Sequence, residues 1–160
     1  MNKNEIRSRF KDAPWYSQDK ETSCIVGGAG GIGSWLSFML ARAGVTPYIY
    51  DYDNVELHNI GGQLFSKLDI GKSKVEAIGD IIANFSDVYI MSSEEKYDKA
   101  SMTSTYMFSA FDNMEARRAM FNNWRVANKE NPNAIFIDGR LLMEQMQIFC
   151  VTTEEQAEIY

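Results

Sequence analysis

Six consecutive positions, 28–33, read Gly-Ala-Gly-Gly-Ile-Gly and match the pattern G-x-G-x-x-G. The first glycine of this pattern permits a tight turn, the second lets a phosphate approach bare backbone, and the third lets a helix pack closely on a strand. Free amide groups at the helix start then face an anion, helped by the helix dipole. The candidate nucleotide-binding glycines are Gly28, Gly30, Gly31 and Gly33.

An acidic residue stands where a nucleotide site of this kind needs one. Asp51 follows Gly33 by 18 residues, which is the position of a carboxylate that binds ribose hydroxyls. The glycine pattern and this aspartate together predict a bound nucleotide. They do not distinguish NAD, used for redox chemistry, from ATP, used for adenylation.

The elements that position these residues alternate between strand and helix. Apolar runs predict strands over 22–28, 46–51, 87–91, 107–111, 134–137 and 144–152, and three-four spacing predicts helices over 32–43, 71–84 and 114–129. Alternation of this kind predicts an α/β, Rossmann-like, mostly parallel sheet with helices on both faces. Ligands of such sheets bind beyond the C-terminal strand ends, where the glycines, Asp51 and Asp112 lie.

Length and composition favour one domain with a real core, since the chain has 160 residues and 45% of them are hydrophobic. We expect an N-terminal helical arm over 1–21 and a nucleotide-binding domain over 22–160. The formal charge is -6 without a Lys/Arg run, which argues against a nucleic-acid partner. No apolar run reaches the roughly 18 residues of a membrane span, and the N-terminus has no apolar signal core. These features predict a cytoplasmic protein.

Cysteine and histidine usage adds little chemistry. Cys24 and Cys150 both lie in apolar runs and are expected to be small core side chains in a reducing compartment. His58 has no Cys or His at ligand spacing, so we expect an exposed loop residue rather than a zinc ligand.

Further blocks follow Asp51 in a fixed order. They are Asp51-Tyr52-Asp53 with Val55, Asn59 and Gln63, then Asp69-Ile70-Gly71-Lys72-Ser73-Lys74, then Asp112-Asn113-Met114-Glu115-Ala116-Arg117. With the glycine loop and Ser34, the sequence resembles the ubiquitin-activating-enzyme-like adenylyltransferases, the ThiF/MoeB/HesA family. That family has a GxGGxGs loop, D-x-D-x-V-x-x-x-N-x-x-R-Q, D-x-G-x-x-K and D-N-x-x-x-R. The resemblance is close over residues 24–118 and looser to 152.

The resemblance implies an ATP- and Mg²⁺-dependent adenylyltransferase. In that family a C-terminal carboxylate, usually the Gly-Gly end of a small ubiquitin-like or sulfur-carrier protein or peptide, attacks the α-phosphate to give an acyl-adenylate and pyrophosphate. By position, the resemblance assigns Asp51 to the ribose, Asn59 and Gln63 to the phosphates, Lys74 to charge neutralisation and Asp112 to the metal. Asp53 is assigned to the nucleotide site or, equally, to a turn cap. The family also implies a homodimer.

Elementary chemistry agrees with these roles. Attack by one anion on another needs cations and donors placed where charge builds up, and Lys74 supplies a mobile point charge. Mg²⁺ takes one or two carboxylates plus phosphate oxygens, so Asp112 alone suffices. Other roles stay open: Asp112-Asn113 could cap the next helix, Lys72 could be an exposed charge, and Arg117 is expected to pair with a carboxylate or pack at a dimer interface.

The chain departs from the family at two points. Gly62 stands in place of the arginine of the N-x-x-R-Q block, and loss of such a cation costs about 10³ in rate. We hypothesise that Arg140, expected at the ligand edge after the fifth strand, or Arg9 compensates. The family domain also continues beyond the sixth strand, so its C-terminal part is expected to be missing here. Dimerisation would then cover exposed surface, with Met143, Met146 and Ile148 as candidates.

Two other functions remain open. The chain could be a degenerate nucleotide-binding module that retains the fold without catalysis, as Gly62 suggests. An NAD-dependent oxidoreductase is less favoured, because no catalytic His or Lys/Tyr pair follows the glycine loop, and the block from Asn59 to Lys74 then has no role.

Overall fold

The structure, a computed structural model, describes residues 8–10, 12–13 and 22–160. Its centre is one six-stranded sheet in the order β3-β2-β1-β4-β5-β6. The strands are β1 (Thr22–Gly27), β2 (Val45–Tyr50), β3 (Met91–Ser93), β4 (Tyr106–Ser109), β5 (Ile135–Leu142) and β6 (Gln145–Val151). The helices are η1 (Ser8–Phe10), α2 (Gly33–Ala43), η2 (Leu57–Gly61), η3 (Lys67–Asp69), α3 (Lys74–Phe85), α4 (Met114–Ala127) and α5 (Glu154–Ile159).

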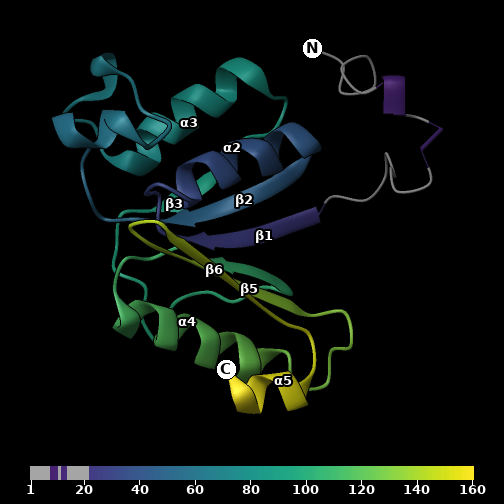
Figure 1. Ribbon diagram of the computed structural model, residues 1–160. Coiled ribbons are helices and arrows are strands. Elements are labelled where there is room, and N and C mark those ends of the chain that lie inside the picture. The colour runs from purple at the N-terminus through teal and green to yellow at the C-terminus, as the bar shows by residue number, and fades with distance from the viewer. Residues whose placement is uncertain (1–7, 11, 14–21) are drawn as a thin grey trace.

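Helices cover both faces of this sheet. Figure 1 shows α2 and α3 on one side of it and α4 and α5 on the other. The five strands from β3 to β5 are parallel neighbours, and β6 pairs antiparallel with β5. The predicted α/β, Rossmann-like, mostly parallel architecture is therefore confirmed.

The strand order places a topological switch point beside the glycine loop. The chain builds β1, β2 and β3 outward in one direction and then returns to add β4 on the other side of β1. Ligands of open parallel sheets bind at such a switch point, outside the carboxyl ends of the strands. The segments after β1, β2 and β4 are therefore the ones to inspect.

Local sequence explains where the helices begin and end. Ser73, Asn113 and Thr153 are the N-caps of α3, α4 and α5, and each side-chain oxygen accepts a backbone N–H of the first turn. Gly44 ends α2 in the left-handed region, at φ 92°, where glycine has no steric penalty.

Two apolar clusters hold the helices to the sheet. One lies under α2 and α3 and includes Ile49, Val75 and Ile78. The other lies under α4 and α5 and includes Met107 and Phe136. Because both faces of the central strands are buried, those strands are continuous apolar runs rather than alternating ones.

Cys24 and Cys150 differ in burial. Cys24 is buried in β1, as predicted, and burial raises the pKa of its thiol to about 12. Cys150 is exposed, so its predicted core position is wrong. The reason is that β6 is the edge strand, and most of its residues are exposed in spite of their apolar sequence.

Several element boundaries differ from the sequence-based predictions. The third strand lies at Met91–Ser93 rather than 87–91, and β5 continues to Leu142 rather than ending at 137. The helix predicted from 71 begins at Lys74, because Gly71 has φ 90° and Ser73 is the cap. The irregular segment 52–68 contains η2 and the start of η3, and α5 was not predicted.

The N-terminal arm is described only in part. Of residues 1–21, the structure describes the single 3-10 turn η1 and residues 12–13, and the remaining positions lie outside the described residues. Within the described ranges, no helix combines the length and apolar character needed to cross a lipid bilayer.

Candidate functional site

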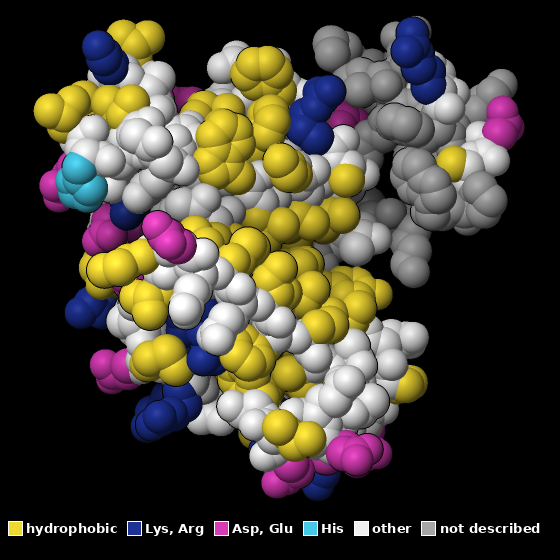
Figure 2. All heavy atoms as spheres, in the orientation of Figure 1, with side chains coloured by type: hydrophobic (Ala, Val, Ile, Leu, Met, Phe, Trp, Pro, Cys, Tyr) yellow, Lys and Arg dark blue, Asp and Glu magenta, His cyan; other side chains and the backbone are white. Residues whose placement is uncertain are grey.

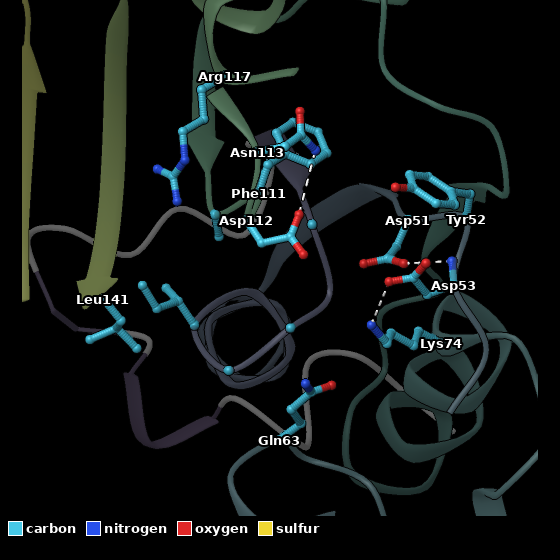
Figure 3. Close-up of a pocket in the computed structure, with 15 residues that line it drawn as sticks. Asp51, Tyr52, Asp53, Gln63, Lys74, Phe111, Asp112, Asn113, Arg117 and Leu141 are labelled. Carbon is cyan, nitrogen blue, oxygen red and sulfur yellow. Dashed lines mark hydrogen bonds and ion pairs between the residues drawn. The ribbon is translucent and has the colours of Figure 1, made fainter. Parts of the chain in front are cut away.

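A pocket opens at this switch point, at the carboxyl ends of β1, β2 and β4 (Figure 3). Its volume is about 210 Å³. It is lined by Gly28, Gly30, Gly31, Ile32, Asp51, Tyr52, Asp53, Gln63, Lys74, Ala110, Phe111, Asp112, Asn113, Arg117 and Leu141. The fold thus gathers residues from four separate sequence blocks around the start of α2.

The four glycines of the loop divide into two kinds. Gly28 has φ +89°, and a Cβ on Gly33 would lie 1.8 Å from the carbonyl oxygen of Gly28, so the backbone itself requires these two. Gly30 and Gly31 are different, because a Cβ on either would meet nothing within 4 Å. They leave open space on the pocket side, where a phosphate could approach.

Donors at the start of α2 remain available to a ligand. The amide groups of Gly30, Gly31 and Ile32 have no acceptor among the described residues, whereas Ser34 and Leu36 already donate within the helix. Orphan amides at a helix N-terminus form a natural anion site when the backbone is bare. The arrangement fits a phosphate group.

Asp51 joins the glycine loop to the loop after β2. Its Oδ2 accepts the amide of Ala29 at 2.6 Å, and its Oδ1 accepts the amide of Asp53 at 2.8 Å. Burial raises the pKa of Asp51, while these two N–H groups oppose the rise. An ionised carboxylate has about four lone-pair sites, so Asp51 retains acceptors for hydroxyl groups of a ligand.

The raised pKa of Asp51 predicts a pH-dependent stability. The native state keeps a proton that the unfolded chain has released, so stability falls as pH rises from about 4 through the native pKa. The amide side chain in the Asp51→Asn variant cannot ionise, so it contributes no such pH dependence. We therefore expect the stability of the variant relative to that of wild type to increase as the pH rises through this range, whatever the pH-independent cost of the substitution. Urea unfolding of both proteins at several pH values checks this. A difference between them that does not change with pH contradicts it.

Lys74 is the first residue of α3 and is only 7% exposed. Its Nζ lies 2.9 Å from Oδ2 of Asp53, and its amide donates to the carbonyl of Asp53. Asp53 therefore pairs with the lysine of the site, and the helix cap is Ser73 instead. This ion pair holds the ammonium group at the pocket wall.

The two predicted phosphate-contacting amides occupy different places. Gln63 lines the pocket, and its Oε1 is buried without a partner among the described residues. Asn59 does not line the pocket: its Oδ1 accepts the amide of Glu56 at 2.8 Å in the capping box of η2. The structure explains Asn59 by local geometry, and its role at the phosphates stays a prediction.

Asp112 and Asn113 follow β4 and also differ in role. Asn113 caps α4 through the amide of Ala116 at 2.8 Å, whereas Asp112 is exposed and lines the pocket. Among the residues that the structure describes, no three His, Cys, Asp or Glu side chains cluster as metal ligands. The donor set fits Mg²⁺, which completes its coordination with water and phosphate oxygens.

Gly62, which replaces the arginine of the family pattern, has open space beside it. A Cβ on Gly62 would meet nothing within 4 Å, and its carbonyl accepts the Nε1–H of Trp35 at 3.1 Å. His58, in the 3-10 turn η2 that Gly62 follows, is exposed as predicted.

Neither hypothesised substitute arginine lines the pocket. Arg140 lies inside β5 rather than after it, because β5 is extended by its hairpin with β6. Its Nε donates to Asp138 at 2.6 Å and its guanidinium packs on Phe149. Arg9 is exposed in η1. The compensating role of these two residues stays a prediction without geometric support.

The guanidinium that does line the pocket is that of Arg117. It pairs with the buried carboxylate of Asp138, which confirms the predicted carboxylate partner. Sequence reasoning missed Asp138 itself. An acid directly after the apolar run Ile135-Phe136-Ile137 is a signal, because a carboxylate that is buried with that strand requires a partner.

Comparisons with known proteins are consistent with this geometry. The sequence model of the ThiF family matches residues 5–141. The chain is 34% identical over 124 residues to ubiquitin-like modifier-activating enzyme 5 of Culex quinquefasciatus, covering 66% of this chain and 31% of that protein. For the Caenorhabditis elegans enzyme of the same name, the identity is 32%, covering 66% and 29%. The chain therefore spans less than a third of these curated relatives.

Solved structures agree at the level of the fold. PaaA superposes with a TM-score of 0.64 at 27% identity, covering 75% of this chain and 38% of PaaA. Escherichia coli tRNA N6-threonylcarbamoyladenosine dehydratase, TcdA, solved in complex with ATP, superposes with a TM-score of 0.65 at 20% identity, covering 89% of this chain and 59% of TcdA. Escherichia coli MccB with MccA-N7isoASN superposes with a TM-score of 0.66 at 19% identity, covering 92% of this chain and 42% of MccB.

Proposed function

The chain belongs to the ThiF family, and from this premise we propose that it is an ATP-dependent adenylyltransferase. Its substrate is the C-terminal carboxylate of a small ubiquitin-like or sulfur-carrier protein, or of a peptide ending in glycine. The observation that supports this best is the pocket itself, where open glycines, Asp51, Lys74 and Asp112 surround one space. The names of the curated relatives, which activate ubiquitin-like modifiers, support the substrate class.

Five of the pocket residues have a definite task in this proposal. Asp51 accepts the ribose hydroxyls, the amides of Gly30 and Gly31 receive phosphate oxygens, and Lys74 neutralises charge on them. Asp112 would hold Mg²⁺, which when bound neutralises the triphosphate. A carboxylate oxygen of the substrate attacks the α-phosphorus as its bond to the pyrophosphate oxygen breaks, and pyrophosphate leaves with that electron pair. The protein contributes position and charge.

The nucleotide base needs more room than this pocket offers. Its volume of about 210 Å³ is below the roughly 300–1,000 Å³ of ordinary ligand sites. A neighbouring groove of about 810 Å³ shares Tyr52, Phe111, Asp112 and Asn113 with it and continues to Lys96 and Tyr97. We assign the base to this groove, where aromatic side chains offer stacking surfaces.

ATP–pyrophosphate exchange tests the proposal. Synthetic peptides ending in Gly-Gly should support exchange in the presence of Mg²⁺, whereas the same peptides with a C-terminal amide should not, since they lack the carboxylate that attacks the α-phosphorus. Protein that binds ATP in calorimetry yet supports no exchange with any such peptide is instead the nucleotide-binding module that Gly62 suggests. A change in NADH fluorescence on mixing would favour the oxidoreductase.

Asp112 gives a prediction on the metal. Asp112→Asn should lower the exchange rate by roughly 10²-fold or more and shift the Mg²⁺ dependence to higher concentration, because an amide is a weaker ligand for a hard cation. The thermal midpoint should not change, since the side chain is exposed. The measurement is exchange against Mg²⁺ concentration, and an unaltered Mg²⁺ profile contradicts the assignment.

We also propose that the protein is a homodimer and is cytoplasmic. Figure 2 shows hydrophobic side chains gathered in a band across one face, where Figure 1 places β1, β5 and β6. The hairpin of β5 and β6 exposes Leu141, Leu142, Met143, Met146 and Ile148. Contiguous exposed apolar residues of this kind mark interaction surfaces.

The dimer proposal predicts the effect of one surface charge. Met146→Lys should weaken self-association by about tenfold or more, because it places a charge in a desolvated contact. Sedimentation velocity over a range of protein concentrations measures this. Val126→Lys, at an exposed apolar position on α4, is the control and should leave association unchanged. Equal effects of both variants contradict the assigned surface.

A further inference from the structure

A buried charge cluster lies against the pocket wall and has no role in the nucleotide contacts above. Asp138 is fully buried, and it accepts from Nη1 of Arg117, from Nε of Arg140 at 2.6 Å and from the hydroxyl of Tyr160 at 2.8 Å. Burial raises the pKa of Tyr160 to about 12, so it is a neutral donor. Two guanidinium groups thus share one carboxylate, so the negative charge of Asp138 offsets only one of the two positive charges.

That surplus charge reaches the pocket through Arg117. Only Nη1 of Arg117 is used by protein partners in the described part of the chain: it donates to Asp138 and, at 3.0 Å, to the carbonyl of Gly139. Guanidinium has five N–H donors in a planar fork, so its Nε and Nη2 groups remain available. Arg117 is 7% exposed and lines the pocket, whereas Arg140 does not.

Arg117 also lies on the side of the pocket that the nucleotide does not need. Figure 3 shows Arg117 and Leu141 on one side and Asp51, Asp53 and Lys74 on the other. The assigned ribose and phosphate contacts use that second side and the glycines between. Leu141 bounds the Arg117 side, as does Ile32, whose side chain lies against Gly139, the residue that accepts a hydrogen bond from Arg117. Leu141 continues into the exposed apolar hairpin of β5 and β6.

A polypeptide tail ending in a carboxylate matches this wall. Its backbone can pass the apolar residues, and its terminal group needs a cation, because Asp51, Asp53 and Asp112 make the pocket acidic. Arginine binds a carboxylate through two parallel hydrogen bonds, which also orients the attacking oxygen. Resting on the proposed function, we infer that Arg117, held by Asp138, binds and orients the substrate carboxylate rather than the nucleotide.

Calorimetry with two probes tests this inference. One probe is ATP with Mg²⁺, and the other is a glycyl sulfamate of adenosine, a stable mimic of the acyl-adenylate that retains the acyl oxygen. Arg117→Lys keeps the charge but loses the planar fork. It should weaken binding of the mimic by about tenfold and leave ATP binding within about twofold. Arg118→Lys, the same change at an exposed neighbouring position, should alter neither.

The outcomes separate this inference from the proposed function. If the wild-type protein does not bind ATP, the proposed function is wrong. If wild type binds ATP, the inference is overturned when Arg117→Lys weakens both probes equally, weakens neither, or is surpassed by Arg140→Lys in its effect on the mimic. Should Arg117→Lys not fold, a crystal structure of wild type with the mimic decides: an acyl oxygen within hydrogen-bond distance of Arg117 supports the assignment, and one more distant overturns it.

Discussion

Gly33→Ala is expected to destabilise the protein by about 3 kcal/mol, which lowers its thermal midpoint by roughly 10 °C, and to abolish ATP binding. Helix propensity alone gives the opposite sign, since alanine is about 1 kcal/mol better than glycine in a helix. The contact decides, because the new Cβ would lie 1.8 Å from the backbone oxygen of Gly28. A backbone oxygen cannot rotate away as a side chain can, so α2 must separate from the loop that binds phosphate.

Gly31→Ala is the matched control, two residues earlier in the same loop. Nothing lies within 4 Å of its added Cβ, so the thermal midpoint should stay within about 2 °C of wild type. ATP affinity should still fall, because the methyl group occupies the space left for a phosphate. Thermal melts and calorimetry on both variants make the comparison. A Gly33→Ala protein as stable as Gly31→Ala would contradict the close packing of Gly33 against the backbone of Gly28.

Local patterns predicted the centre of this fold well because its signals are short in range. The glycine loop, the apolar run of β1 and the three-four spacing of α2 each depend on neighbouring residues. The end of β5 depends instead on its pairing with β6, through contacts such as Arg140 with Gln147. For that reason the sequence suggested a free strand end at residue 137, and Arg140 was expected at the ligand edge.

In the candidate site, too, some residues could be predicted from local sequence, whereas the contacts of others depend on tertiary packing. Spacing from the glycine loop predicts Asp51, the family resemblance predicts Lys74, and the structure brings both to the pocket. Arg117 was expected to bind a carboxylate, but its position at the pocket wall depends on Asp138, from a strand 21 residues later. Asn59 has the right spacing and nevertheless serves η2, since capping and ligand binding use the same side-chain oxygen. Spacing identifies residue types, and only tertiary packing decides what each one contacts.

Lys74→Met should reduce ATP–pyrophosphate exchange by about 10³-fold, the scale on which one preorganised transition-state contact acts. Lys74 is held at the pocket wall by burial and by Asp53 at 2.9 Å, so its charge is in position before a ligand arrives. With glycine at position 62, Lys74 is the cation on the nucleotide side of the described pocket. Its removal leaves the phosphates facing Asp51 and Asp53, and ATP affinity should fall with the rate.

The control separates loss of charge in the site from loss of charge on the protein. Lys72→Met changes the same residue type two positions earlier, but Lys72 points to the surface, where its Nζ pairs with Asp80 at 2.6 Å. Lys72 does not line the pocket, and a solvent-exposed pair of this kind adds little to stability, so exchange should stay within roughly twofold of wild type. Lys74→Met with Asp53→Asn removes both members of this ion pair and tests whether an unpaired acid, rather than the missing cation, stops the reaction. If that double variant recovers exchange to near the wild-type rate, Lys74 serves to neutralise Asp53 and does not act on the phosphates.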